Sequence, residues 1–149
     1  MTTRHRILVV DDHALIRESI RMMLSADPDL EIVGEAGSLG EAVSCVRALS
    51  PDLVLTDLSM PDTHGIEAVT ELKFHFPRIP ILVVSGHRES EIKSRCREAG
   101  AAGYVMKHSM HYELLDGICT VLRGKTYLGA DAPPEGMAGD HGYARHAAR

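Results

Sequence analysis

The sequence has little cysteine, no excess of positive charge and no long hydrophobic run. Its 149 residues include three cysteines, Cys45, Cys96 and Cys119, which lie far apart and match neither metal-finger nor redox-motif spacing. Cys45 and Cys119 fall among helical apolar positions, where a free cysteine behaves as a small hydrophobe. We therefore expect a chain without disulfides, in a reducing, cytoplasmic setting.

Charge and hydropathy argue against two further classes of protein. Sixteen basic against 21 acidic residues give a net charge of −5, so the chain as a whole is not expected to bind nucleic acid directly. The first apolar run, residues 7–10, is too short for a signal peptide or a membrane span and precedes two aspartates. Apolar residues make up 44% of the chain, which is enough for the core of one compact domain.

Short apolar runs alternate with helical periods through the first part of the chain. Most of the runs lack polar alternation, which predicts strands buried on both faces of a parallel sheet, whereas the run at 30–33 alternates and suits an edge. The predicted strands are 7–10, 30–33, 53–55, 81–84 and 103–106, and apolar stripes at helical spacing occupy 16–24, 39–46, 66–76, 92–99 and 114–122. Repeated strand–helix units predict an α/β fold, a three-layer sandwich around a five-stranded parallel sheet.

Polar side chains with distinctive chemistry stand at the ends of these strands. Asp11 and Asp12 follow the first strand, Asp57 the third, Ser85 the fourth, and Lys107 the fifth. Because the carboxyl ends of parallel strands meet at one edge, we expect these side chains to lie close together. Crowded carboxylates repel unless a cation lies among them, and Mg²⁺ prefers oxygen ligands and needs only one or two carboxylates. With a lysine opposite the metal, such a pocket suits a phosphoryl group.

Each of these residues alone has an ordinary explanation. An aspartate after a strand is usually a turn former or a helix N-cap. Ser85 precedes Gly86 and would usually be a turn residue, and a single lysine such as Lys107 is usually a solvated charge. The occurrence of all of them, in order and at the ends of the strands, favours a functional site.

The same residues form part of a longer pattern that resembles the receiver domain of two-component response regulators. The pattern comprises Asp11-Asp12, Pro51-Asp52-x-Val54-x-x-Asp57-x-x-Met60-Pro61, Gly65, Ser85 and Lys107, and the resemblance covers roughly residues 5–124. The Asp-Asp-His opening and the Gly-x-x-Tyr-Leu stretch at 124–128 are most similar to the NarL/FixJ subfamily. The resemblance implies a flavodoxin-like fold and a phosphorylation-dependent signalling switch.

The resemblance also implies roles for individual residues. Asp57 would accept a phosphoryl group from a sensor histidine kinase in a Mg²⁺-dependent reaction. Asp12 and Asp57 would ligate the Mg²⁺ through their side chains and Ser59 through its backbone carbonyl, with Asp11 assisting directly or through water.

Three further residues would respond to the phosphoryl group. By the same resemblance, Lys107 would pair with one phosphoryl oxygen and the hydroxyl of Ser85 would move to bond another. Tyr104 matches the switch aromatic of the family, whose ring turns inward when that hydroxyl moves. A half-buried strand aromatic is the other reading of Tyr104.

We expect a receiver domain at residues 1–128 and a flexible tail or remnant linker at 129–149, which is rich in Gly, Pro and Ala. This tail is too short for the DNA-binding helix-turn-helix domain that the subfamily normally carries. The resemblance therefore implies transcription regulation only in a longer form, and both a truncated regulator and a stand-alone receiver remain open. A homodimer through the last helix or the fourth-helix face fits the family.

Two other functions would use some of the same residues. A Mg²⁺-dependent phosphohydrolase with an aspartyl nucleophile would need a second acid two residues after Asp57, where Ser59 stands. A phosphorylation-independent interaction module would not need the intact acidic set. We therefore expect a phosphoacceptor regulator rather than an enzyme.

Overall fold

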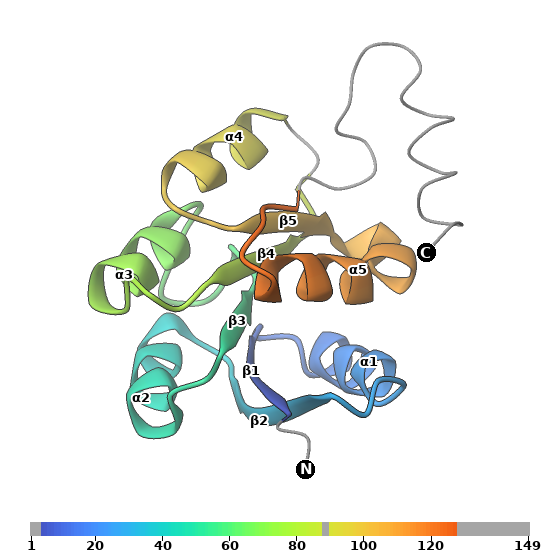
Figure 1. Ribbon diagram of the computed structural model, residues 1–149. Coiled ribbons are helices and arrows are strands. Elements are labelled where there is room, and N and C mark those ends of the chain that lie inside the picture. The colour runs from blue at the N-terminus through green and yellow to red at the C-terminus, as the bar shows by residue number, and fades with distance from the viewer. Residues whose placement is uncertain (1–3, 88–89, 128–149) are drawn as a thin grey trace, which may run out of the picture.

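The computed structural model describes residues 4–87 and 90–127, which form a parallel sheet with helices on both faces (Figure 1). The strands are β1 (His5–Val10), β2 (Leu30–Ala36), β3 (Leu53–Thr56), β4 (Ile81–Ser85) and β5 (Gly103–Met106), in the spatial order β2-β1-β3-β4-β5. The helices are α1 (Ala14–Leu24), α2 (Leu39–Leu49), α3 (Glu67–His75), α4 (Ser90–Glu98) and α5 (Met110–Leu122), with the 3₁₀ turn η1 (Lys107–Ser109) before α5. The predicted flavodoxin-like (βα)5 sandwich is confirmed.

The buried apolar residues of the strands divide between two cores, because successive side chains point to opposite faces of the sheet. Leu8 and Val83 pack with α2, α3 and α4, whereas Ile7 and Leu82 pack with α1 and α5 (Figure 1). All four side chains are buried. Burial on both faces explains why most of the strand segments lack polar alternation.

β2 lies at the edge of the sheet, as its alternating sequence predicted, and extends beyond the predicted run to Ala36. Its pairing with β1 shifts register, so that Ile7 lies opposite Ile32 while Leu8 lies opposite Gly34. A Cβ on Gly34 would lie 2.7 Å from the Leu49 Cδ1, so a larger residue would require the Leu49 side chain to move.

Local signals account for where α2 and α5 begin or end. The Ser38 hydroxyl accepts a hydrogen bond of 3.1 Å from the Glu41 backbone N–H, and the Glu41 carboxylate accepts one of 2.7 Å from the Gly37 N–H. These two bonds form a capping box in which the carboxylate reaches one residue beyond the N-cap. α5 ends shortly before Gly124, whose φ of 84° lies in the left-handed region that glycine favours.

The chain after α5 returns to the sheet, which the sequence pattern did not predict. Tyr127 forms a parallel bridge with Gly103 of β5, its backbone N–H donates to the Ala102 carbonyl at 2.9 Å, and its carbonyl accepts from the Tyr104 N–H at 3.1 Å. Its hydroxyl donates to the Glu113 Oε1 of α5 at 3.1 Å. A Cβ on Gly103 would lie 3.0 Å from the Tyr127 carbonyl oxygen, so glycine permits this close approach.

Other expectations of the sequence analysis concern cysteines, membranes and the tail. Cys45, Cys96 and Cys119 are all free thiols. Within residues 4–87 and 90–127 there is no helix whose length and apolar character would allow it to cross a membrane. The predicted tail at 129–149 lies outside the described residues.

Candidate functional site

The carboxyl ends of β1, β3 and β5 bring two acids and a lysine into contact. Asp11 directly follows β1 and Asp57 directly follows β3, and only 2% and 4% of their surfaces are exposed. Lys107, the first residue of η1, places its Nζ 3.0 Å from the Asp11 Oδ2 and 3.1 Å from the Asp57 Oδ2. The predicted convergence of Asp11, Asp57 and Lys107 at one edge of the sheet is therefore observed.

The charges of this cluster do not cancel. Burial lowers the pKa of Lys107, but hydrogen bonds from its ammonium to Asp11 and Asp57 and the charges of both acids outweigh this effect and raise the pKa overall. Lys107 is consequently charged at neutral pH. One ammonium faces two carboxylates, and Asp12 adds a third, so the cluster has the ligand atoms to hold a metal ion.

Asp57 is held at both carboxylate oxygens. Its Oδ1 accepts a hydrogen bond of 2.7 Å from the Leu58 backbone N–H, and its Oδ2 accepts from Lys107. Its own backbone N–H donates to the Val10 carbonyl at 2.9 Å, which continues the pairing of β1 with β3. An acid at the end of a buried strand is thus oriented rigidly, with few rotamers left to it.

A fourth side chain, His13, joins the acids. Its Nδ1 lies 2.9 Å from the Asp11 Oδ1 and 3.1 Å from the Asp12 Oδ1, and one ligand atom from each of Asp11, Asp12, His13 and Asp57 lies within 4.8 Å of the others. Three carboxylates converging on one point suit a hard divalent cation such as Mg²⁺. From the sequence, His13 was only part of the Asp-Asp-His signature, and its place in the cluster was not predicted.

Ser85 and Tyr104 are both hydrogen-bonded to the backbone of His87. Ser85, at the end of β4, is fully buried, and its hydroxyl accepts a hydrogen bond of 3.1 Å from the His87 backbone N–H. The Tyr104 ring is buried in the core, and its hydroxyl donates to the His87 carbonyl at 2.7 Å. The switch roles of Ser85 and Tyr104 stay predictions, as does the metal role of the exposed Ser59.

Asp62 fixes the loop that follows Asp57, a role that the sequence analysis missed. Its carboxylate accepts hydrogen bonds from the backbone N–H groups of Leu39 at 2.8 Å and Gly40 at 3.0 Å, at the start of α2. These two bonds lower the pKa of Asp62. The loop that contains Ser59 is therefore anchored to a neighbouring helix, and no local sequence signal links residues so far apart.

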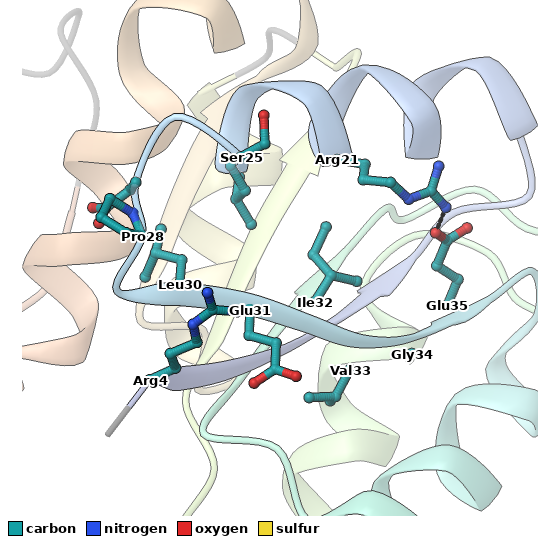
Figure 2. Close-up of a pocket in the computed structure, with 12 residues that line it drawn as sticks. Arg4, Arg21, Ser25, Pro28, Leu30, Glu31, Ile32, Val33, Gly34 and Glu35 are labelled. Atoms are coloured by element: carbon teal, nitrogen blue, oxygen red, sulfur yellow. Dashed lines mark ion pairs between the residues drawn. The ribbon is translucent and has the colours of Figure 1, made fainter. Parts of the chain in front are cut away.

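The groove shown in Figure 2 lies away from the cluster. Its volume is about 640 Å³, and it runs along β2 beside the end of α1. None of the predicted site residues lines it. The predicted chemistry thus belongs to the carboxyl edge of the sheet and not to this groove.

Comparisons with known proteins agree with the geometry. Residues 7–118 match the response regulator receiver domain family. The response regulator protein VraR of Staphylococcus aureus is 36% identical over 121 residues, which cover 81% of this chain and 58% of VraR, so the chain spans less than two thirds of that relative's length.

Solved structures give the same result. A two-component response regulator of the LuxR family from Aurantimonas sp. SI85-9A1 has a TM-score of 0.82 and 32% identity, and the match covers 99% of this chain and 100% of that one. The non-phosphorylated receiver domain of the stress response regulator RcsB from Escherichia coli has a TM-score of 0.80 and 25% identity, covering 85% of this chain and 99% of that one. The chain therefore belongs to the receiver domains of two-component response regulators, within the NarL/FixJ-like subfamily.

Proposed function

We propose that Asp57 is the phosphoacceptor of this receiver and that a sensor histidine kinase supplies the phosphoryl group. The observation that carries the proposal is the Lys107 ammonium in contact with both Asp11 and Asp57 at the edge of the sheet. A carboxylate oxygen of Asp57 forms a bond to phosphorus while the phosphorus–nitrogen bond to the kinase histidine breaks, and the imidazole leaves with the electron pair of that bond.

The neighbouring residues compensate the charge of the transferred group. Lys107 is placed to pair with a phosphoryl oxygen once Asp57 carries the group. The carboxylates of Asp11, Asp12 and Asp57, with the backbone carbonyl of Ser59, are the ligands that would hold Mg²⁺. Mg²⁺, when bound, neutralises negative charge on the phosphoryl oxygens.

The response begins at Ser85. Movement of its hydroxyl towards the phosphoryl group would exchange the hydrogen bond to His87 for one to a phosphoryl oxygen. Because the Tyr104 hydroxyl bonds the same His87, the two side chains would respond together and alter the face formed by α4 and β5. Phosphorylation then shifts the population between two states of the receiver.

The wider setting follows from the subfamily. We propose a phosphorylation-dependent regulator of the cytoplasm, with the receiver at residues 1–128, a linker-like tail at 129–149, and transcription regulation as the output of a longer form. A homodimer is compatible with the family, and DNA binding would need a domain other than the receiver. Ser59 stands where a phosphohydrolase would need its second acid, so the proposed chain is not an enzyme.

Mass spectrometry tests the proposal directly. After incubation with Mg²⁺ and phosphoramidate, the intact protein should carry one added phosphoryl group, and Asp57→Asn should abolish the addition. Wild-type protein that binds Mg²⁺ and stays unmodified would contradict the assignment of Asp57. Hydrolysis of many equivalents of a phosphate ester would instead identify a phosphohydrolase.

A further inference from the structure

Arg17 of α1 contacts the backbone of Asp11, directly after β1, and has no part in the proposed function. Its Nη1 donates a hydrogen bond to the backbone carbonyl of Asp11, and its Nε donates to the Glu35 Oε1 of β2 at 3.0 Å. The Arg17 side chain is 23% exposed, so most of it lies against the protein. One guanidinium therefore joins α1, β2 and the loop after β1.

The contact to Arg17 completes the set of hydrogen bonds around Asp11. The Asp11 backbone N–H donates to the Ala36 carbonyl at 2.9 Å, and its Oδ1 accepts from the His13 N–H at 2.8 Å in a local turn. Its Oδ2 accepts from Lys107. Only the backbone carbonyl is left, and Arg17 is its partner.

We propose that Arg17 is a positioning residue for the cation site, an inference that rests on the proposed function. The Asp11 carbonyl belongs to the peptide unit that joins Asp11 to Asp12, so a rotation of this unit would swing the Asp12 carboxylate relative to Asp57. The guanidinium fixes the orientation of the peptide unit before a cation binds. Preorganised ligands bind a cation more tightly than ligands that must first be ordered.

Glu35 fixes Arg17 in turn, and its second partner offers a matched control. Arg21, one turn further along α1, forms an ion pair with the other oxygen of Glu35 (Figure 2). Among the described residues, the side-chain ion pair of Arg21 is with Glu35 and does not involve Asp11. Loss of Arg21 therefore removes a cation from Glu35 without releasing the Asp11 carbonyl.

Calorimetric titration with Mg²⁺ distinguishes a positioning role from a general structural one. Arg17→Met should weaken Mg²⁺ binding about 10-fold, as expected when a residue that supports metal ligands is removed. Arg21→Met should weaken it less than about threefold, because an exposed ion pair contributes little. Arg17→Lys should fall between them, since an ammonium keeps the charge but cannot donate in two fixed directions.

A second readout needs no metal. The His13 backbone N–H donates to the Asp11 Oδ1, so its hydrogen exchange, followed by NMR in metal-free protein, should accelerate in Arg17→Met and not in Arg21→Met. A cooperative unfolding transition in urea, measured for each variant, shows that the variant is folded. Equal effects of the two substitutions, or unchanged exchange and affinity in Arg17→Met, would overturn the inference. Wild-type protein that binds Mg²⁺ but is not phosphorylated contradicts the proposed function alone.

Discussion

β1 and β4 are the two neighbours of β3 in the sheet. The segment that begins at Asp11 after β1 (the β1 corner) and the segment that begins at Ser85 at the end of β4 (the β4 corner) differ in where their hydrogen-bond partners lie. After β1, Asp11 is bonded to residues from α1, β2 and η1 as well as to its own loop. After β4, the Ser85 hydroxyl accepts its described hydrogen bond from His87, two residues along the same loop. His87 is in turn bonded by Tyr104 of β5.

This difference in hydrogen bonding suits the two segments to different tasks, binding of a cation and phosphoryl group on one side and conformational change on the other. Carboxylates that bind a cation and meet a phosphorus atom work best when their positions are fixed in advance. A hydroxyl that must change partners works best when the bond it gives up is local, because little else is disrupted. We infer that the β1 corner serves the chemistry and the β4 corner serves the response.

Replacement of Lys107 by methionine should have the largest effect, through the β1 corner. Asp11 and Asp57 would lose their shared cation while the apolar stem is largely kept, so phosphorylation of Asp57 by phosphoramidate should slow about 100-fold. A time course of intact mass measures the rate, with the exposed Lys125→Met as the control. An unchanged rate would contradict the role of Lys107.

Ser85→Ala should affect the conformational response to phosphorylation more than phosphorylation itself. Phosphorylation of Asp57 should slow less than about 10-fold, because one hydrogen bond contributes about 1 kcal/mol. The change in the Tyr104 backbone amide resonance that phosphorylation of the wild type produces in NMR spectra should be lost. Ser85→Thr keeps the hydroxyl and should retain it, and a full response in Ser85→Ala would assign the switch to another residue.

Tyr104→Phe should loosen the β4 corner in the unphosphorylated protein. The substitution removes the hydroxyl that bonds the His87 carbonyl and keeps the buried ring, so the free energy of unfolding should fall by about 1 kcal/mol. Urea denaturation measures the change. Tyr112→Phe, at a residue that is 83% exposed, is the matched control and should leave the stability unchanged.

The smallest expected effect is a loss of stability in acid that arises from Asp62, in the loop after β3. The pKa of Asp62 is lowered below its ordinary value of 3.8 by the Leu39 and Gly40 N–H groups, so its stabilising contribution is present above that pH. The contribution is lost as the pH falls through the folded pKa. Comparison of wild type with Asp62→Asn by urea unfolding at about pH 6 and about pH 3 should show the difference between them shrinking in acid. Because Asp62 is exposed, the change is small.

The convergence of Asp11, Asp57 and Lys107 was predictable because it follows from topology alone. Parallel strands bring their carboxyl ends to one edge, so residues far apart in sequence meet there without any further information. A parallel sheet buried on both faces followed from the same apolar runs, whereas the strand order β2-β1-β3-β4-β5 did not. For this part of the molecule, periodicity and strand ends were sufficient.

Arg17, Asp62 and Tyr127 were not predictable in the same way. Arg17 reads as a solvated helix charge and Asp62 as a turn residue, and only the packed structure shows which backbone groups they contact. Tyr127 joins the sheet through a single bridge, which is too short to produce a strand pattern in the sequence. Contacts that depend on one distant partner leave no periodic signal.

The bridge at Tyr127 has a consequence for anything covalently joined downstream. Since the Tyr127 carbonyl accepts from the Tyr104 N–H, Tyr127 is hydrogen-bonded to β5, the strand that contains Tyr104. A displacement of β5 would therefore also displace Tyr127. The fluorescence of a probe attached just after Tyr127 would then report on the conformational state of the receiver.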